Sequence, residues 1–179
     1  MTKFSSELLK VIDLAKKTYY YCSQNAISSV NLLLSMAMEK SCLAYEVLSR
    51  LGLDYQKARS FVLEIAPEGE FSLSYEAEEV FQHAKKVAKE CGYKNICSHH
   101  LLLAVVTLNH KSVRQILWDF DITADKITAA VNAINYYGIG LDESGDKYST
   151  GKNIKISGCI KNKELEREIL KHLKNDIYN

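Results

Sequence analysis

The sequence has 179 residues, enough for one well-buried domain or for two small halves that share a core. Its 23 basic residues nearly balance its 22 acidic residues, so no net field attracts nucleic acid or an anionic membrane, and neither partner is expected. One proline and eight glycines favour helices, because a β-rich chain of this length needs more turn residues.

The beginning of the chain and its cysteines predict a cellular compartment. Lys10, Asp13 and Lys16 interrupt the first apolar segment, which therefore lacks the core of a signal peptide. Across the sequence, apolar runs stay shorter than the 18 or so residues that a membrane span needs. Five cysteines, an odd number without a disulfide-like spacing, predict reduced thiols and a cytoplasmic location.

The chain contains an internal duplication. Residues 4–65 align without a gap on residues 73–134, and 16 of these 62 positions are identical. Most identities are apolar residues or helix-start residues, such as Ser5 with Ser74 and the leucine triplets 32–34 and 101–103. Because the polar residues mostly differ, the duplicated feature is interpreted as a packing unit.

The first repeat, about residues 4–65, predicts four helices. Apolar residues recur at three- and four-residue spacing after Ser5, which can cap the first helix. A second helix, capped by Ser29, is apolar on most sides and is expected to be the buried centre of the repeat. Gly52 ends the third helix and Asp54 caps the fourth. The expected ranges are about Ser5 to Cys22, from Ser29 onward, Leu43 to Leu51, and Asp54 to about Ile65.

The second repeat, about residues 73–135, has the same order. Its helices are expected over about 74–91, 98–108, 112–120 and 123–135. The sole proline, Pro67, lies between the copies, in a predicted linker over 66–72. Residues 1–137 are therefore predicted to form the double repeat. Residues 138–179 are predicted to form a separate glycine-rich and charged tail, with a short helix at about 163–173.

At the second repeat the sequence resembles a known family. Residues 90–105, Glu-Cys-Gly-Tyr-Lys-Asn-Ile-Cys-Ser-His-His-Leu-Leu-Leu-Ala-Val, resemble the signature of the Clp N-terminal repeat domain found in ClpC- and ClpA-type unfoldases. Phe4-Ser5 and Leu73-Ser74 match the opening of each family repeat, and Leu51-Gly52-Leu53-Asp54 matches the turn before its fourth helix. The resemblance implies an all-α, pseudo-twofold domain of eight helices, built from two tandem four-helix repeats.

The tail resembles the linker and first helix of the ATPase module that follows this domain in the family, over residues 146–149 and 158–170. A phosphate-binding loop needs two glycines with four residues between them, and the second glycine is followed by Lys and a hydroxyl residue. Here five residues separate Gly145 from Gly151, and Asn153 replaces the hydroxyl. No nucleotide or other cofactor is therefore expected.

The resemblance implies a non-enzymatic module that binds proteins. Its expected partners are a Clp ATPase, adaptor proteins or clients. In the family, phosphorylated arginine is held by an acidic residue directly before the His-Leu-Leu stretch of each copy. Val30 and His99 stand at these positions. Neither offers a fixed negative charge, so loss of phosphoarginine recognition is expected.

Other residues are expected to contact partners. The helix-start amides near Ser5 and Ser74 can hold an anion. The run Thr18-Tyr19-Tyr20-Tyr21 should face partly outward on the first helix, either as a sticky surface that permits a weak homodimer or as rings that pack within the domain. The predicted protein-contact residues are Ser5, Tyr19, Tyr20, Val30, Ser74 and His99.

Two alternatives accompany this hypothesis. The chain is either a free-standing binder or the recognition fragment of a larger Clp ATPase. A different class, a small thiol- or metal-dependent enzyme, is suggested by Cys91, Cys97, His99 and His100. Their spacing is not that of a usual zinc finger, and buried thiols beside helix-start histidines are the preferred interpretation. No catalytic or metal-binding residue is predicted.

Overall fold

The computed structural model describes residues 3–17, 19–20, 26–63, 72–136, 140–141 and 147–148. Within this part it is mostly helical, and eight helices and eight two-residue strands are described. The helices are α1 (Ser6–Ala15), α2 (Ser29–Met38), α3 (Leu43–Arg50), α4 (Tyr55–Ser60), α5 (Tyr75–Glu90), α6 (Ser98–Leu108), α7 (Lys111–Asp119) and α8 (Ala124–Tyr136). The strands are β1 (Lys3–Phe4), β2 (Tyr19–Tyr20), β3 (Ala26–Ile27), β4 (Val62–Leu63), β5 (Ser72–Leu73), β6 (Asn95–Ile96), β7 (Gly140–Leu141) and β8 (Lys147–Tyr148). The all-α fold class is confirmed.

The two halves of the molecule have the same order of four helices at matched positions. The 69-residue shift that aligns the sequences also carries the first residues of α1, α2 and α4 onto those of α5, α6 and α8. Ser5 and Ser74, at matched positions, cap α1 and α5, each accepting a backbone N–H at 3.2 Å. The predicted pseudo-twofold arrangement of two four-helix repeats is therefore confirmed.

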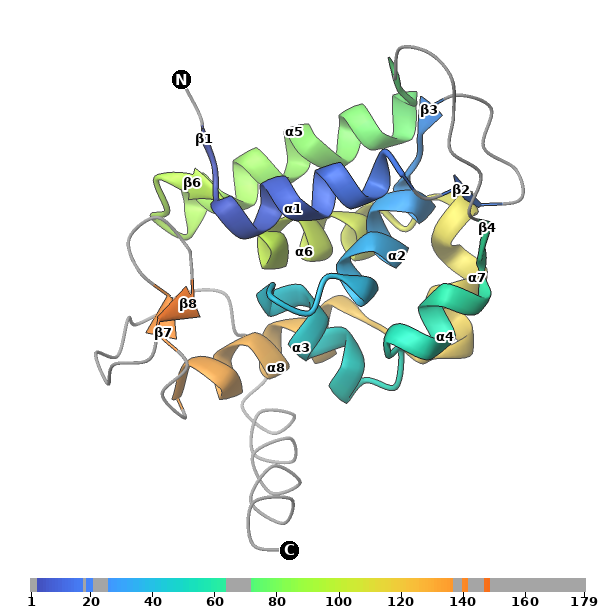
Figure 1. Cartoon of the computed structure of the whole chain (residues 1–179). Coiled ribbons are helices and arrows are strands. Elements are labelled where there is room, and N and C mark those ends of the chain that lie inside the picture. The colour runs from blue at the N-terminus through green and yellow to red at the C-terminus, as the bar shows by residue number, and fades with distance from the viewer. Residues whose placement is uncertain are drawn as a thin grey trace, which may run out of the picture.

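Helices α2 and α6 form the centre of the core (Figure 1). All ten residues of α2 are buried, and so are eight of the eleven residues of α6. Helices α1 and α5 pack on one side of this pair, and α3, α4, α7 and α8 pack on the other. A helix that is apolar on most sides has to be covered in this way, as the leucine triplets predict.

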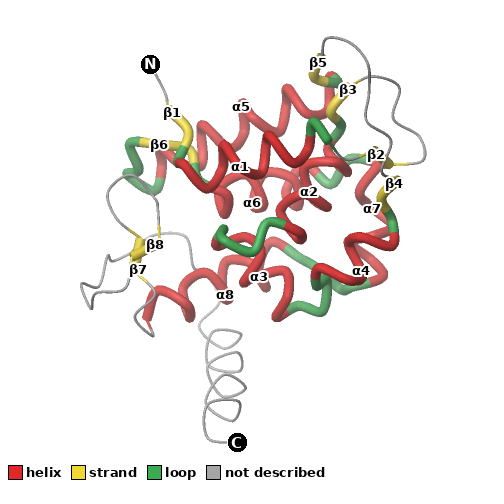
Figure 2. Tube along the Cα trace, in the orientation of Figure 1, coloured by secondary structure: helices red, strands yellow, loops and turns green. Residues whose placement is uncertain are grey.

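Short strands link the two repeats (Figure 2). The segment before α1 (β1) pairs in parallel with the segment before α6 (β6), and β3 pairs in the same way with β5. The Ser5 N–H donates to the carbonyl of Ile96 at 2.9 Å, and the Ser74 N–H donates to the carbonyl of Ile27 at 2.9 Å. Each repeat thus supplies the edge that holds the other repeat's first helix.

Two predicted helices of the first repeat are shorter than expected. Helix α1 ends at Ala15 rather than near Cys22, and α4 ends at Ser60 rather than near Ile65. The residues that follow them form β2 and β4, which pair antiparallel. Aromatic and β-branched residues favour such pairing, and a run of three tyrosines after Thr18 is of this kind. In the second repeat the matched residues stay within α5 and α8.

The second helix also starts differently from the prediction. Its cap is Ser28, not Ser29, and the Ser28 hydroxyl accepts the Asn31 N–H at 3.4 Å. In return the Asn31 side-chain oxygen accepts the Ser28 N–H at 3.1 Å. This reciprocal capping box is stronger than the single cap that Ser29 would have provided.

The predicted linker and tail lie largely outside the described residues. Of the linker over 66–72 only Ser72 is described, and of the tail over 138–179 only the antiparallel pair β7–β8. The expected helix at 163–173 is outside the described part, so the division into double repeat and tail stays a prediction. Within the described ranges, every helix is too short or too polar to cross a membrane.

Candidate functional site

At the predicted anion sites, the hydroxyl and backbone N–H groups of Ser5 and Ser74 already take part in hydrogen bonds within the domain. Both hydroxyls cap their own helix, and both backbone N–H groups bond across to the other repeat. Ser5 is 1 % exposed, while Ser74 is half-buried. The two serines therefore position α1 and α5. A role for them in binding another protein stays a prediction.

Val30 and His99 lie at matched positions near the starts of α2 and α6, and both are buried. Their exposed fractions are 3 % and 2 %. Contact between these side chains and a bound protein would require the helix starts to open, so that role also stays a prediction. Tyr19 and Tyr20 lie in β2 instead of on a helix, and their side chains are outside the described part.

A polar cluster forms where the sequence places Cys97, His99 and His100. Their potential ligand atoms lie within 4.8 Å of one another, and all three residues are buried. The two histidine rings are 4.0 Å apart, and Tyr93 packs edge-on against each of them. Burial lowers the pKa of His99 to about 3. Burial, together with the neighbouring His99, lowers the pKa of His100 well below its usual range, so both rings are neutral at pH 7.

Hydrogen bonding in this cluster does not fit a zinc site. The Cys97 N–H donates to Nδ1 of His100 at 3.0 Å, so a neutral His100 carries its own proton on Nε2. The Cys97 thiol points to the carbonyl of Asn95 at 3.5 Å. To bind zinc, this cluster would have to offer the Cys97 thiolate and imidazole lone pairs, and structural zinc sites usually have four ligands. Of the two histidines, only His99 has a ring-nitrogen lone pair that no described group uses, and a single imidazole is too few for a zinc centre.

A serine, a histidine and a glutamate from different parts of the sequence form a hydrogen-bonded triad that the sequence did not reveal. The Oγ of Ser29 lies 3.0 Å from Nδ1 of His110, whose Nε2 lies 3.0 Å from a carboxylate oxygen of Glu79. This order resembles a catalytic triad. Ser29 is 0 % exposed, however, so a substrate carbonyl cannot reach its oxygen. These hydrogen bonds instead join the start of α2 to α5, and so connect the two repeats.

Exposed apolar side chains are accessible to a binding partner, unlike the buried polar groups described above. Leu73, in β5, and Tyr75, the first residue of α5, are 39 % and 74 % exposed. They border a surface hollow of about 690 Å³, here called the α5 hollow, whose other lining residues include Phe81 and Leu108. The charged residues Glu78, Glu79 and Lys86 also line it, together with His83. A hydrogen bond to Glu79 and its negative charge raise the pKa of Tyr75.

Comparison with known proteins identifies the family. The "Clp repeat (R) N-terminal domain" matches residues 3–120. The chain belongs to the Clp N-terminal domain family.

One curated relative extends the match along nearly the whole chain. This protein, the "ATP-dependent Clp protease ATP-binding subunit ClpA homolog" of Guillardia theta, is 26 % identical over 191 residues. The alignment covers 93 % of this chain and 23 % of that protein. The chain thus spans about a quarter of the length of the curated relative it matches.

Solved structures share the fold of this Clp N-terminal domain. The Hsp104 N-terminal domain from Candida albicans has a TM-score of 0.55 at 19 % identity, over 76 % of this chain and 92 % of that one. A chain from a study of a malarial protein secretion system has a TM-score of 0.56 at 16 % identity, over 72 % and 92 %. The N-terminal domain of ClpD from Arabidopsis thaliana has a TM-score of 0.50 at 15 % identity, over 72 % and 94 %.

Proposed function

We propose that this Clp N-terminal domain is a non-enzymatic protein-binding module that takes adaptors, clients or parts of the Clp machinery as its partners. The observation that carries the proposal is the α5 hollow, where Leu73 and Tyr75 expose apolar surface beside charged side chains. Family membership supports it, since residues 3–120 match a Clp repeat (R) N-terminal domain and the curated relative is named as an ATP-binding subunit of a Clp protease.

The chemistry of the α5 hollow suits a protein partner. Tyrosine is enriched at the centres of protein interfaces, because its ring buries a large area while its hydroxyl still bonds. Charged groups of both signs surround the apolar part, which matches the polar rim of such interfaces. A polyanion would instead need a basic surface, and Glu78 and Glu79 oppose it.

Catalysis by Cys97 or by Ser29 receives no support from the placement of these residues. Cys97 is 1 % exposed and Ser29 is 0 % exposed, so neither nucleophile meets solvent. The thiols of Cys42, Cys91 and Cys97 suit the reducing cytoplasm, which we propose as the location. Both arrangements of the module, free-standing or as part of a larger Clp ATPase, are compatible with this proposal.

The proposal is tested by affinity capture with matched surface variants. The full chain, its Tyr75→Ala variant and its Leu9→Ala variant are immobilised, and proteins retained from native lysate are quantified by mass spectrometry. Leu9 is a suitable control because it is 48 % exposed on α1 and does not line the α5 hollow. We expect partners that bind the wild type and Leu9→Ala but lose at least about tenfold with Tyr75→Ala, as for an interface anchor worth more than about 1.4 kcal/mol. An identical set of partners for all three proteins would contradict the proposal.

A further inference from the structure

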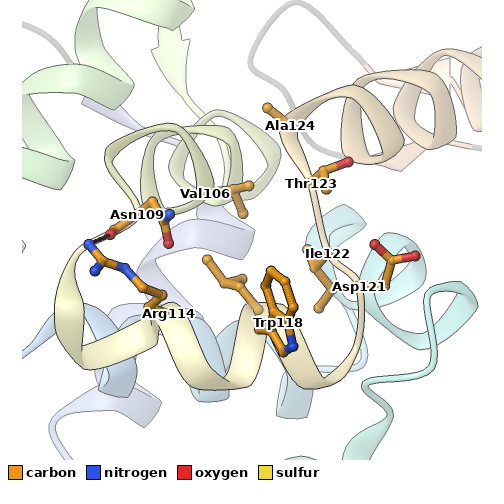
Figure 3. Close-up of a pocket in the computed structure, with 9 residues that line it drawn as sticks. Val106, Asn109, Arg114, Trp118, Asp121, Ile122, Thr123 and Ala124 are labelled. Carbon is orange, nitrogen blue, oxygen red and sulfur yellow. Dashed lines mark hydrogen bonds between the residues drawn. The ribbon is translucent and has the colours of Figure 1, made fainter.

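The second repeat has an open groove between α6, α7 and α8, separate from the α5 hollow. Its volume is about 530 Å³, in the range of roughly 300–1,000 Å³ that holds small ligands. The buried side chains of Val106, Leu117 and Ile122 contribute to its floor, and Trp118 stands at its edge, 81 % exposed (Figure 3). We call this hollow the α7–α8 groove.

The polar side chains lie at the two ends of the α7–α8 groove. Arg114 donates to the backbone carbonyl of Asn109 at 3.3 Å, at the end away from Asp121 (Figure 3). Asp121 pairs with Lys126. An indole left largely in water beside an apolar floor is an unfavourable arrangement for an isolated domain and typical of a contact surface.

The internal duplication allows the residues of this groove to be compared with those at matched positions in the first repeat. Shifting by 69 residues carries Arg114 onto Tyr45, Ala124 onto Tyr55 and Trp118 onto Ser49. Tyr45 and Tyr55 are half-buried and pack against the apolar core. In the first repeat, two aromatic residues therefore stand at positions that match groove-lining residues of the second repeat. The second repeat lacks both rings.

Polar contacts in the first repeat complete the comparison. The ammonium group of Lys40 lies 5.1 Å from the centre of the Tyr55 ring, and Arg59 donates to the Tyr55 hydroxyl at 3.5 Å. A cation near an aromatic ring is favourable. Arg114 in the second repeat brings a guanidinium group, which stacks on aromatic rings, to the corresponding groove.

We propose that the α7–α8 groove binds tyrosine side chains of another protein, which take the place that Tyr45 and Tyr55 have in the first repeat. The rings pack on the apolar floor and against Trp118, and the hydroxyl meets the polar ends near Arg114. This site is independent of the α5 hollow, so the failure of either proposal leaves the other standing.

The test uses the full chain and N-acetyl-tyrosine amide as the probe. Trp118 is the sole tryptophan, so its indole N–H gives one reporter signal in a ¹⁵N-correlated NMR spectrum. We expect a saturable shift of this signal, with a dissociation constant in roughly the millimolar range for so small a ligand. N-acetyl-alanine amide should bind at least about tenfold more weakly, because it lacks the ring. An equal response to both probes, or no saturation with the tyrosine probe, would overturn the proposal.

Two variants locate the binding. Ala124→Tyr restores the residue of the first repeat and should fill the groove, abolishing the shift while leaving the rest of the spectrum folded. Trp118→Ser, also the residue of the first repeat, should weaken binding at least about fivefold, read from the backbone amides of Ile122 and Ala124. Unchanged affinity in Trp118→Ser would overturn the proposal even if Ala124→Tyr failed to fold. A Trp118 signal that moves on dilution without probe would identify a second copy of this chain as the occupant and overturn it too.

Discussion

His99 and His100 lie side by side at the start of α6, and both are removed from water. Their burial makes the charged form of each ring costly, which is why the pKa of His99 falls to about 3 and that of His100 falls further. In the first repeat Val30 and Asn31 stand at these positions. Asn31 repeats the capping role of His100, but Val30 carries no titratable group.

Acid should destabilise the fold through these two rings. In the unfolded chain each histidine takes up a proton below about pH 6.5, whereas in the folded chain both stay neutral. Stability is therefore full above pH 6.5 and is lost as the pH falls, down to about 3 for His99. By pH 5 each ring should have cost about 2 kcal/mol of the free energy of unfolding, measured by urea titration at several pH values.

The residue of the first repeat supplies the matched variant. His99→Val removes one of the two protons, so the loss between pH 7.5 and pH 5 should shrink by about 2 kcal/mol relative to the wild type. Carboxylates contribute equally to both proteins and cancel in the difference. A pH profile of His99→Val that runs parallel to that of the wild type would show that His99 is not held neutral.

At the scale of elements, matched helix ends use different residues for the same backbone turn. Gly52 follows α3 with a φ of +94°, and Asp121 follows α7 with a φ of +50°. Glycine adopts such a conformation without strain, while other residues pay a steric cost, least for Asn and Asp. A Cβ on Gly52 would meet only Phe120, at an ordinary contact distance of 3.9 Å.

Replacing Gly52 should therefore measure the backbone cost almost alone. Gly52→Ala is expected to lower the free energy of unfolding by about 1 kcal/mol, because alanine is strained at positive φ. Gly52→Asn should cost less than half of that, since short polar side chains tolerate this region. Urea denaturation of both variants is the measurement, and equal losses would indicate that crowding rather than φ sets the cost.

Much of the element order could be predicted because the duplication supplies each helix twice. The ends of α1 and α4 could not be predicted, because each helix stops where β2 or β4 begins. These two strands pair with each other, and neither segment indicates this pairing on its own. The α7–α8 groove was also missed. Two of its lining residues, Arg114 and Ala124, stand where the first repeat has Tyr45 and Tyr55. They lie on different helices and come together only in the folded chain.

At the scale of the whole molecule, neither repeat encloses its own core. Helix α2 packs against α3 and α4 of its own repeat and against α6 and α7 of the other. Polar contacts also cross between repeats, where the Ala44 N–H donates to the Ser98 hydroxyl at 3.2 Å and Ser29 meets His110. Part of the roughly 1.5–3 kcal/mol that burial of each leucine on α2 contributes therefore depends on the presence of the other repeat.

A single repeat should therefore not fold alone. We expect residues 1–71 to show little helix by far-UV circular dichroism, because α2 would expose apolar surface that the second repeat covers. Adding residues 72–179 should restore helicity and a cooperative thermal transition, which the intact chain should show as a single step. Native-like helicity with cooperative melting in the isolated fragment 1–71 would contradict this expectation.

The crossed pairing of β1 with β6 and of β3 with β5 also bears on how such a chain arose. A protein made of one repeat would have nothing to pair with its first strand unless a second molecule supplied the partner. Two such molecules, each lending its strand to the other, form a closed twofold homodimer. Joining two such molecules end to end in one chain would place β1 beside β6 and β3 beside β5, as in the present structure. In the present chain the two halves differ at the positions where Tyr45 and Tyr55 of the first repeat match Arg114 and Ala124 of the second.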